Sequence, residues 1–279
     1  MACDIAFSPC PNDTHIFHAW VHGLVGHALP VNAVLADVQQ LNEWAIQRKY
    51  ALTKVSLGCL KLLLDDYILL PTGAALGFGC GPKIVAKRSF CLADFPAMSV
   101  AIPGKHTTAN LLRQALLPEP AQILYCRYHE VLDLVQSGRV DCGLIIHETR
   151  FTYHKLGFLE LADLGQMWET QKALPIPLGG IVALRSLGMP RLREISQTIR
   201  QSLLFARAHP QYASAYIEAH SQEKDPLVIR QHIDLYVNQE SLQLSSKGRQ
   251  SLQQLLGLPA ADFGAAESPD GAHAWILEN

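Results

Sequence analysis

Charged residues are scarce in this sequence of 279 residues, and neither sign dominates. Asp, Glu, Lys and Arg make up 17% of the chain, with 23 basic and 25 acidic residues and a formal net charge of −2. No cluster of basic residues has the density that binds nucleic acid, so we expect no nucleic-acid partner. No apolar run reaches the roughly 18 residues of a membrane-spanning helix, so we also expect no membrane span.

Paired cysteines are missing as well. The seven cysteines are odd in number, and no two of them form a C-x-x-C pair. This pattern argues against a disulfide framework and against a zinc site, so we expect reduced thiols and no bound metal. The first residues lack the basic segment and apolar core of a secretory signal, which together with the thiols predicts a cytoplasmic location.

Several nucleotide-binding and catalytic motifs are absent. Position 99 is Ser, where a P-loop ending in Gly104-Lys105 would need Gly. The glycine-rich segment 77–81 precedes Pro82 and an expected strand, whereas a dinucleotide-binding loop opens a helix. No G-x-S-x-G sequence marks a serine nucleophile. We therefore interpret 77–81 as a tight connection or hinge.

Apolar residues, by contrast, are plentiful at 49% of the chain, enough to bury sizeable cores and to exclude a disordered chain. At roughly 150 residues per domain, the length suggests about two domains. Hydrophobic periodicity predicts two runs of the order β-α-β-α-β. The first run has expected strands at 4–7, 31–36 and 52–57 and helices at 14–25 and 38–49. The second has expected strands at 98–102, 123–127 and 141–146 and helices at 109–116 and 130–136.

The two runs predict an α/β protein of two lobes with a ligand cleft between them. We expect a large lobe of residues 1–88 and 182–279 and a small lobe of residues 89–181, connected through 81–88 and 175–184. The last third is helical, with expected helices at 192–208, 211–220, 226–237 and 248–256. These helices should cover the sheet of the large lobe, and the tail after Pro259 should be loosely attached.

Ligands of open α/β sheets bind beyond the carboxyl ends of the strands. The turns 8–14, 53–57, 103–108 and 146–150 should therefore line the cleft. Beyond the residues discussed below, we name five candidates for its lining, which are Ser8, Asn12, Asn42, Ile146 and Arg150.

The turn Gly104-Lys105-His106-Thr107-Thr108 has two readings. Free N–H groups at a helix start, two hydroxyls and a lysine suit an anion such as a carboxylate. Thr107 is equally suited to cap the following helix. The sequence leaves both readings open.

His147 follows an apolar strand and falls at the expected cleft. Its ordinary pKa near neutrality suits a general base, while a partly buried histidine with local hydrogen bonds is the alternative. Cys10 falls near the cleft, and we interpret it as structural. His15, His18 and His22 share a helical spacing that we interpret as a helix face. His232 has no site context in the sequence.

The cleft segments, taken together, resemble the 1,4-dihydroxy-6-naphthoate synthase family of the futalosine route to menaquinone. The resemblance covers nearly the whole chain and rests on four segments: Ser8-Pro9-Cys10-Pro11-Asn12-Asp13-Thr14, Leu52-Thr53-Lys54-Val55-Ser56, Pro103-Gly104-Lys105-His106-Thr107-Thr108 and Gly143-Leu144-Ile145-Ile146-His147-Glu148-Thr149-Arg150-Phe151-Thr152-Tyr153.

The resemblance implies a fold like that of type 2 periplasmic binding proteins. It implies a lyase that converts cyclic dehypoxanthine futalosine, an aromatic carboxylate, to 1,4-dihydroxy-6-naphthoate with release of a three-carbon sugar fragment. It implies no metal and no organic cofactor. His147 would be the proton acceptor, and the substrate contacts would come from Lys54, Val55, Ser56, Thr107 and Thr108.

Two alternatives stay open. One is a chorismate dehydratase-like enzyme on the same scaffold, and the other is a non-catalytic binding protein for small carboxylates. The sequence does not give the oligomeric state, the order of proton transfers or the extent of lobe closure.

Overall fold

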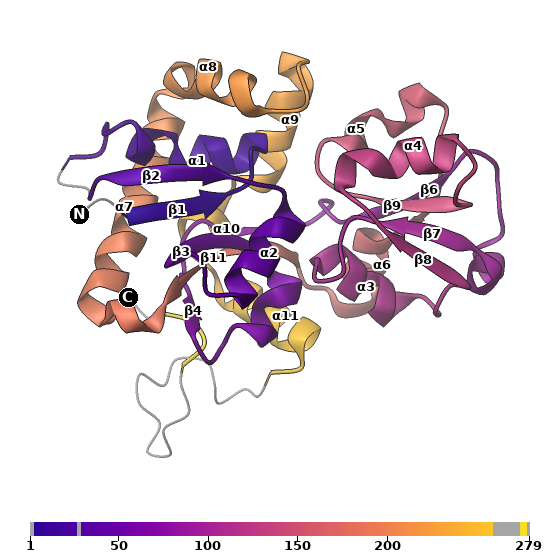
Figure 1. Cartoon of the computed structure of the whole chain (residues 1–279), viewed down its shortest axis with the longest axis horizontal. Coiled ribbons are helices and arrows are strands. Elements are labelled where there is room, and N and C mark those ends of the chain that lie inside the picture. Colours follow the sequence, from indigo (N-terminus) through magenta and orange to yellow (C-terminus); the bar gives the residue numbers. More distant parts are fainter. Residues whose placement is uncertain (1–2, 27–28, 259–273, 278–279) are drawn as a thin grey trace.

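The computed structural model describes residues 3–26, 29–258 and 274–277, and it contains two β-sheets with helices packed on both faces of each (Figure 1). The first sheet is built from both ends of the chain, and the second from its middle. The α/β fold class with two lobes is thereby confirmed. No helix in the described ranges is both long enough and apolar enough to cross a membrane.

The first sheet has the strand order β2-β1-β3-β11-β4, and β5 also pairs with β11. Its strands are β1 (Cys3–Phe7), β2 (Val31–Leu35), β3 (Leu52–Ser56), β4 (Tyr67–Leu69), β5 (Ala75–Gly77) and β11 (Ile176–Leu184). Strands β2 and β3 run parallel to β1, and helices α1 (Pro11–Val21) and α2 (Val38–Ile46) connect them. The returning strand β11 is antiparallel to β3, with Gly179 opposite Ser56.

The second sheet has the order β10-β6-β9-β7-β8. Its strands are β6 (Lys83–Ala86), β7 (Ser99–Ile102), β8 (Gln122–Tyr125), β9 (Cys142–Ile145) and β10 (Leu159–Asp163), and its helices are α3 (Thr108–Leu116), α4 (Val131–Gln136), α5 (Thr149–Thr152) and α6 (Leu164–Lys172). Strands β7, β8 and β9 are parallel, and β6 lies antiparallel beside β9. In both sheets the second strand of the β-α-β-α-β run therefore lies at or toward the edge. The first strand lies beside it, the third strand comes next, and an antiparallel strand follows.

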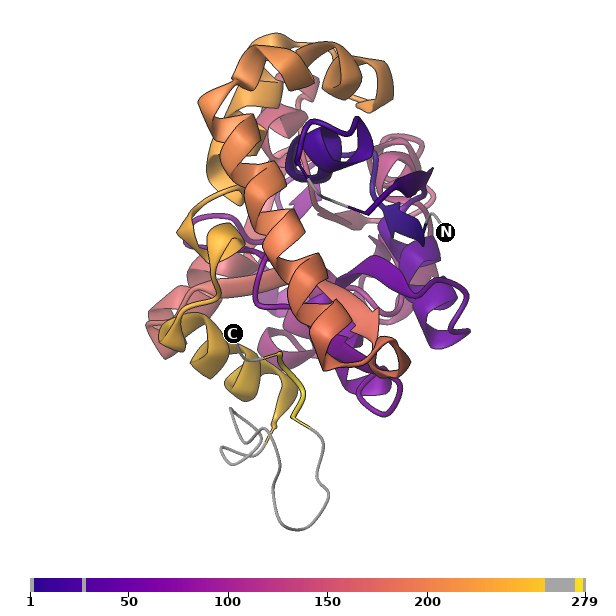
Figure 2. The same ribbon diagram turned by 90° about the vertical axis from the view of Figure 1, so that its left-hand side faces the viewer.

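The remaining helices are α7 (Met189–Ala208), α8 (Pro210–His220), α9 (Pro226–Tyr236), α10 (Gln239–Leu242) and α11 (Ser246–Leu256). Helix α7, the long orange helix of Figure 2, packs Ile199 and Leu203 into one apolar cluster with Ile5 and Phe7 of β1. Helix α11 packs Leu252 on the other side of the sheet. These contacts confirm that C-terminal helices cover the first sheet. Short 3₁₀ helices occupy Leu57–Leu62, Leu92–Ala97, Tyr128–Glu130, Tyr153–Leu156 and Arg185–Leu187.

Helix α1 begins at Pro11, three residues before the expected start at Thr14. Proline suits the first helical position because its fixed φ is helical and its missing N–H would have no partner there. The helix also ends earlier than expected, at Val21, shortly before Gly23 with φ 65°. The shift matters for function because it places Asn12 and Asp13 in the first turn of the helix.

Strand pairing places the change from the first sheet to the second before β6, and not after residue 88 as expected. Strand β6 pairs with β9 and β10 and so belongs to the second sheet, while the whole of β11 pairs within the first. The expectation of a loose tail concerns residues after Pro259, of which 260–273 and 278–279 lie outside the described residues. Trp275, Ile276 and Leu277 are buried, and Leu277 donates a backbone hydrogen bond to Leu69, so this part of the tail is packed.

Candidate active site

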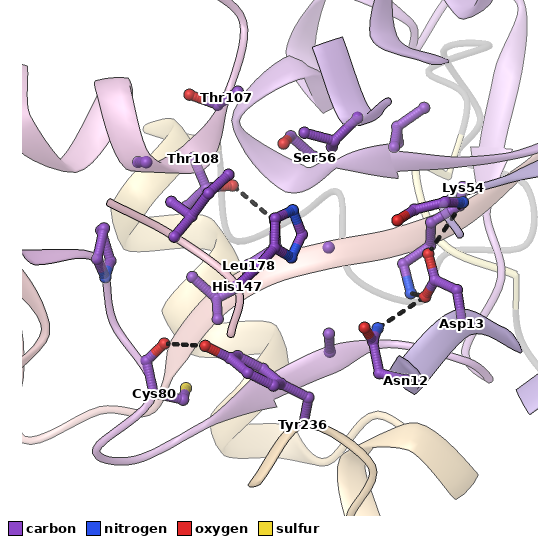
Figure 3. Close-up of a pocket in the computed structure, with 18 of the residues that line it drawn as sticks. Asn12, Asp13, Lys54, Ser56, Cys80, Thr107, Thr108, His147, Leu178 and Tyr236 are labelled. Atoms are coloured by element: carbon purple, nitrogen blue, oxygen red, sulfur yellow. Dashed lines mark hydrogen bonds and ion pairs between the residues drawn. The ribbon is translucent and has the colours of Figure 1, made fainter. Parts of the chain in front are cut away.

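A cleft of about 660 Å³, part of it open to solvent, lies where the two lobes face each other (Figure 3). It lies beyond the carboxyl ends of β1 and β3 in one lobe and of β7 and β9 in the other. Nine of the candidates named from the sequence line it: Ser8, Asn12, Lys54, Val55, Ser56, Thr107, Thr108, Ile146 and His147. The strand-end turns thus come together as expected from the topology.

The structure places Asn42 and Arg150 elsewhere. Asn42 is fully buried behind Ser56, whose amide donates to its Oδ1 at 2.8 Å, and its Nδ2 donates to the carbonyl of His106 at 3.2 Å. This side chain fixes two strand-end turns relative to each other from outside the cleft. The guanidinium of Arg150 donates instead to the carbonyl of Gly79.

Other lining residues were not named as candidates from the sequence. Among them are Asp13, which falls within the expected turn 8–14, and Cys80, Leu178, His232 and Tyr236. Tyr236 closes one side of the cleft by donating from its hydroxyl to the carbonyl of Cys80 at 3.2 Å. His232 lines the cleft although no motif in the sequence marks it as a site residue, and its side chain is fully buried.

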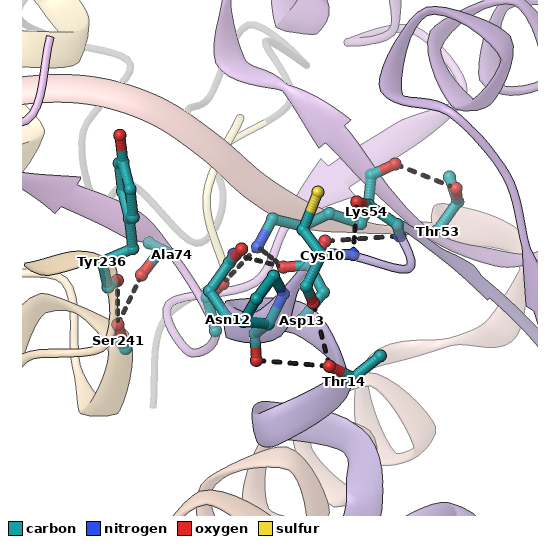
Figure 4. A network of polar contacts seen from close by, with 12 residues as sticks. Cys10, Asn12, Asp13, Thr14, Thr53, Lys54, Ala74, Tyr236 and Ser241 are labelled. Atoms are coloured by element: carbon teal, nitrogen blue, oxygen red, sulfur yellow. Dashed lines mark hydrogen bonds and ion pairs between the residues drawn. The ribbon is translucent and has the colours of Figure 1, made fainter. Parts of the chain in front are cut away.

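Lys54 is held by a buried ion pair. Its Nζ lies 2.6 Å from Oδ1 of Asp13 and 3.2 Å from the carbonyl of Gly73, and both charged side chains are almost fully buried (Figure 4). Asn12 extends the network by donating from Nδ2 to Asp13 at 2.8 Å. The ammonium group thus already has two protein acceptors before any ligand binds.

The structure shows Thr107 in the capping role. Its hydroxyl accepts a hydrogen bond from the amide of Asn110 and donates to the carbonyl of Gly104. The hydroxyl of Thr108 donates to the carbonyl of Leu178 and accepts from the amide of Gly58, both at 2.8 Å. The groups that this turn offers to an anion are therefore the first amides of α3, which have no carbonyl one turn earlier.

His147 has an unusual backbone and an unpaired ring nitrogen. Its φ of 56° is in the left-handed region, a conformation that costs on the order of 1–3 kcal/mol for a non-glycine residue and that clusters at functional sites. Its Nδ1 lies 3.5 Å from Sγ of Cys10, while the buried Nε2 has no protein partner. The ring therefore keeps one nitrogen free for a ligand in the cleft.

The surroundings of His147 favour its neutral form. Burial, assisted by the positive charge of Lys54, lowers the pKa of His147 to about 4. At neutral pH the imidazole is uncharged, and one ring nitrogen carries a lone pair that can accept a proton.

His232, which lines the cleft, lies beside the buried Glu148. Nε2 of His232 lies 2.9 Å from Oδ1 of Asn12, and its Nδ1 lies 3.8 Å from Oε2 of Glu148. Neither of these two facing atoms has a hydrogen-bond partner. Burial raises the pKa of Glu148 and lowers that of His232, so both neutral forms are favoured.

Two α/β lobes with a ligand cleft at their strand ends define the class of periplasmic-binding-protein folds. A Candida albicans protein described as having this generic fold is similar over 100% of this chain and 98% of its own, with a TM-score of 0.65 at 11% identity. A solved protein of Archaeoglobus fulgidus is similar with a TM-score of 0.87 at 30% identity, over 92% of this chain and 96% of that one.

The chain belongs to a family of menaquinone biosynthesis, whose model matches residues 3–261. A 1,4-dihydroxy-6-naphthoate synthase of Thermus thermophilus is 42% identical over 272 residues, covering 96% of this chain and 97% of the relative. One of Streptomyces coelicolor is 41% identical over 263 residues, covering 92% and 93%. The family predicted from the four cleft segments is confirmed, and neither alternative is favoured by these relatives.

Proposed function

We propose that this chain is a carbon–carbon lyase that converts cyclic dehypoxanthine futalosine to 1,4-dihydroxy-6-naphthoate with release of a three-carbon sugar fragment. The two naphthoate synthases that match it over more than nine-tenths of its length support the reaction. The observation in the cleft that carries the proposal is the unpartnered Nε2 of His147 at the end of β9. His147 is an uncharged base in the cleft and lies beside the substrate-binding turns.

The substrate carboxylate binds between the two lobes. The first amides of α3, at Thr108 and Ala109, carry the partial positive charge of a helix N-terminus, which favours an anion. Ser56 lines the opposite wall of the cleft at the end of β3. Its hydroxyl donates to the same carboxylate, so that one ligand group connects both lobes. Lys54, paired with Asp13, adds positive charge without leaving its buried position.

His147 acts as the general base. Neutral imidazole takes a proton from the substrate through Nε2, which requires the ring hydrogen on Nδ1, facing Sγ of Cys10. Removal of a hydroxyl proton allows the adjacent carbon–carbon bond to break and the three-carbon fragment to leave. The remaining ring system becomes aromatic, which provides the driving force. The binding turns hold the substrate in position for this transfer.

The small-molecule partner is thus an aromatic carboxylate. We also propose that the protein works in the cytoplasm, since six cysteines of the described residues are free thiols, as is typical of a reducing compartment.

Incubation of the purified protein with cyclic dehypoxanthine futalosine tests the proposal. Formation of 1,4-dihydroxy-6-naphthoate, followed by its absorbance and by mass, is the expected result. Chorismate serves as the parallel substrate and should remain unchanged. Tight binding of the futalosine derivative without turnover would instead indicate a binding protein, and turnover of chorismate alone would indicate the dehydratase.

A further inference from the structure

Three side chains that commonly bind metals meet beside the cleft. They are Cys10 at the start of α1 and His147 and Glu148 after β9, and one ligand atom of each lies within 4.8 Å of the other two. Sγ of Cys10 and Nδ1 of His147 are 3.5 Å apart. Figure 4 shows the sulfur of Cys10 outside the hydrogen-bonded network of Asn12, Asp13 and Lys54. The three ligands come from both lobes.

The separation of the first two ligand atoms matches zinc geometry. Zinc binds a thiolate at about 2.3 Å and an imidazole nitrogen at about 2.0–2.1 Å in a tetrahedral arrangement, which places those two atoms about 3.5 Å apart. An ion therefore fits between Cys10 and His147 without changing their separation. The carboxylate of Glu148, which has an oxygen within 4.8 Å of both atoms, has to approach the ion.

A second observation concerns the side chain of Glu148. Glu148 is 6% exposed, and its Oε2 has no hydrogen-bond partner. A buried acceptor without a partner costs roughly 1–3 kcal/mol, so this oxygen is available for a ligand. Nδ1 of His232, which is also buried and unpartnered, lies 3.8 Å from the same oxygen.

We propose that Cys10, His147 and Glu148 bind one thiophilic divalent cation such as Zn²⁺, and that the ion inhibits the enzyme. Binding releases the thiol proton of Cys10 and the carboxyl proton of Glu148 to solvent, because thiolate and carboxylate are the forms that bind the metal. Thiolate and carboxylate together then balance the charge of the cation. A water molecule would complete the tetrahedral set of ligands.

Inhibition follows from the single lone pair of neutral imidazole. Once Nδ1 of His147 binds the ion, the ring hydrogen resides on Nε2, which then donates and cannot accept a proton. This part of the proposal rests on the proposed role of His147 as base, whereas binding of the ion does not.

Titration of the chelator-treated protein with Co²⁺ tests the site. We expect a thiolate-to-cobalt charge-transfer band that saturates at one ion per chain. Cys10→Ser should abolish the band and weaken Zn²⁺ binding, measured by competition with a chelating dye, by roughly 100-fold or more, since losing even an outer-shell partner costs 10–100-fold. Cys91→Ser, at an exposed cysteine outside the cluster, is the matched control and should retain both.

Glu148→Gln is the second variant and leaves the thiol and the imidazole in place. It should retain the band but bind Zn²⁺ more weakly. No band in the wild type, a band in Cys10→Ser, or unchanged Zn²⁺ affinity in Glu148→Gln would overturn the site. Full turnover by zinc-saturated protein would overturn the inhibition. Failure of the proposed function is distinguishable from failure of the metal site, because the metal-free protein would then not convert the substrate at all.

Discussion

Lys54 and Asp13 form an ion pair of 2.6 Å in the floor of the cleft, with side chains 5% and 3% exposed. The pair connects the end of β3 to the first turn of α1, and Asn12 links it onward to His232 on α9. Three segments far apart in the sequence are thus joined by buried polar contacts. Burial, together with the positive charge of Lys54, lowers the pKa of the proposed base, His147.

Lys54→Met should lower the free energy of unfolding by about 3–5 kcal/mol, because removal of one partner leaves the other as an unpaired buried charge. Adding Asp13→Asn to this variant should restore part of the loss. Urea denaturation of both variants measures the effect. Arg48→Met removes an exposed pair with Asp66 and should cost no more than about 1 kcal/mol. Equal losses in Lys54→Met and Arg48→Met would contradict the importance of the buried pair.

Thr107→Ala should affect stability more than binding. Its hydroxyl caps α3 and donates its hydrogen to Gly104, so none remains for a carboxylate. Loss of a threonine cap costs roughly 0.5–2 kcal/mol, and Thr107→Ser should recover most of it. Thermal or chemical denaturation, together with a substrate titration, separates the two roles. A large loss of affinity in a variant of normal stability would favour direct contact with the substrate.

Ser56→Ala should show the opposite pattern. A hydrogen bond to a charged group contributes roughly 1.5–3 kcal/mol, which corresponds to about a ten- to hundredfold loss of affinity for the carboxylate. The free energy of unfolding should change little, because the buried amide of Ser56 keeps its bond to Asn42. Calorimetric titration with the product measures this affinity. Unchanged binding would remove Ser56 from the carboxylate site.

The sequence was sufficient to predict the part of the cleft made by strand ends. Ser8, Ser56, Thr107 and His147 all lie at or after the carboxyl ends of parallel strands, and parallel strands bring these ends to one edge of a sheet. Alternating apolar patterns and turn residues locate such ends without any knowledge of long-range contacts. The same reasoning does not choose between a hydroxyl that binds a ligand and one that caps a helix, as Thr107 shows.

The helical side of the cleft could not be predicted in this way. His232 and Tyr236 lie on α9, and their place depends on how α9 packs against α1 and β5. Helical periodicity shows which face of α9 is apolar but not which element covers it. Likewise, the contact of Cys10 with His147 joins two lobes, and no local pattern encodes it.

His147→Asn should lower turnover by about 10²–10⁴-fold, the usual contribution of a general base, because the amide cannot accept a proton at neutral pH. Substrate affinity should change much less, since the carboxylate is bound elsewhere. Single-turnover kinetics on the folded variant measures the chemical step. His154→Asn, at an exposed histidine of the same lobe, is the matched control and should remain near the wild-type rate. A His147→Asn rate within a few-fold of wild type would end the assignment.

The pH dependence of turnover should report the low pKa of His147. Only the neutral ring accepts a proton, so the rate falls as the pH drops through the pKa, which lies at about 4 in the free enzyme. The acid limb of kcat/KM, a free-enzyme quantity, should therefore lie near pH 4 in the presence of a chelator.

A bound carboxylate offsets the charge of Lys54 and favours the protonated ring, so the acid limb of kcat should lie at higher pH. The substrate carboxyl also titrates in this range. The pH dependence of the residual activity of His147→Asn, which lacks the imidazole, identifies the contribution of the substrate carboxyl. An acid limb of kcat/KM at pH 6.5, the ordinary pKa of histidine, would mean that the base is solvated and not held in the buried position that the structure gives to His147.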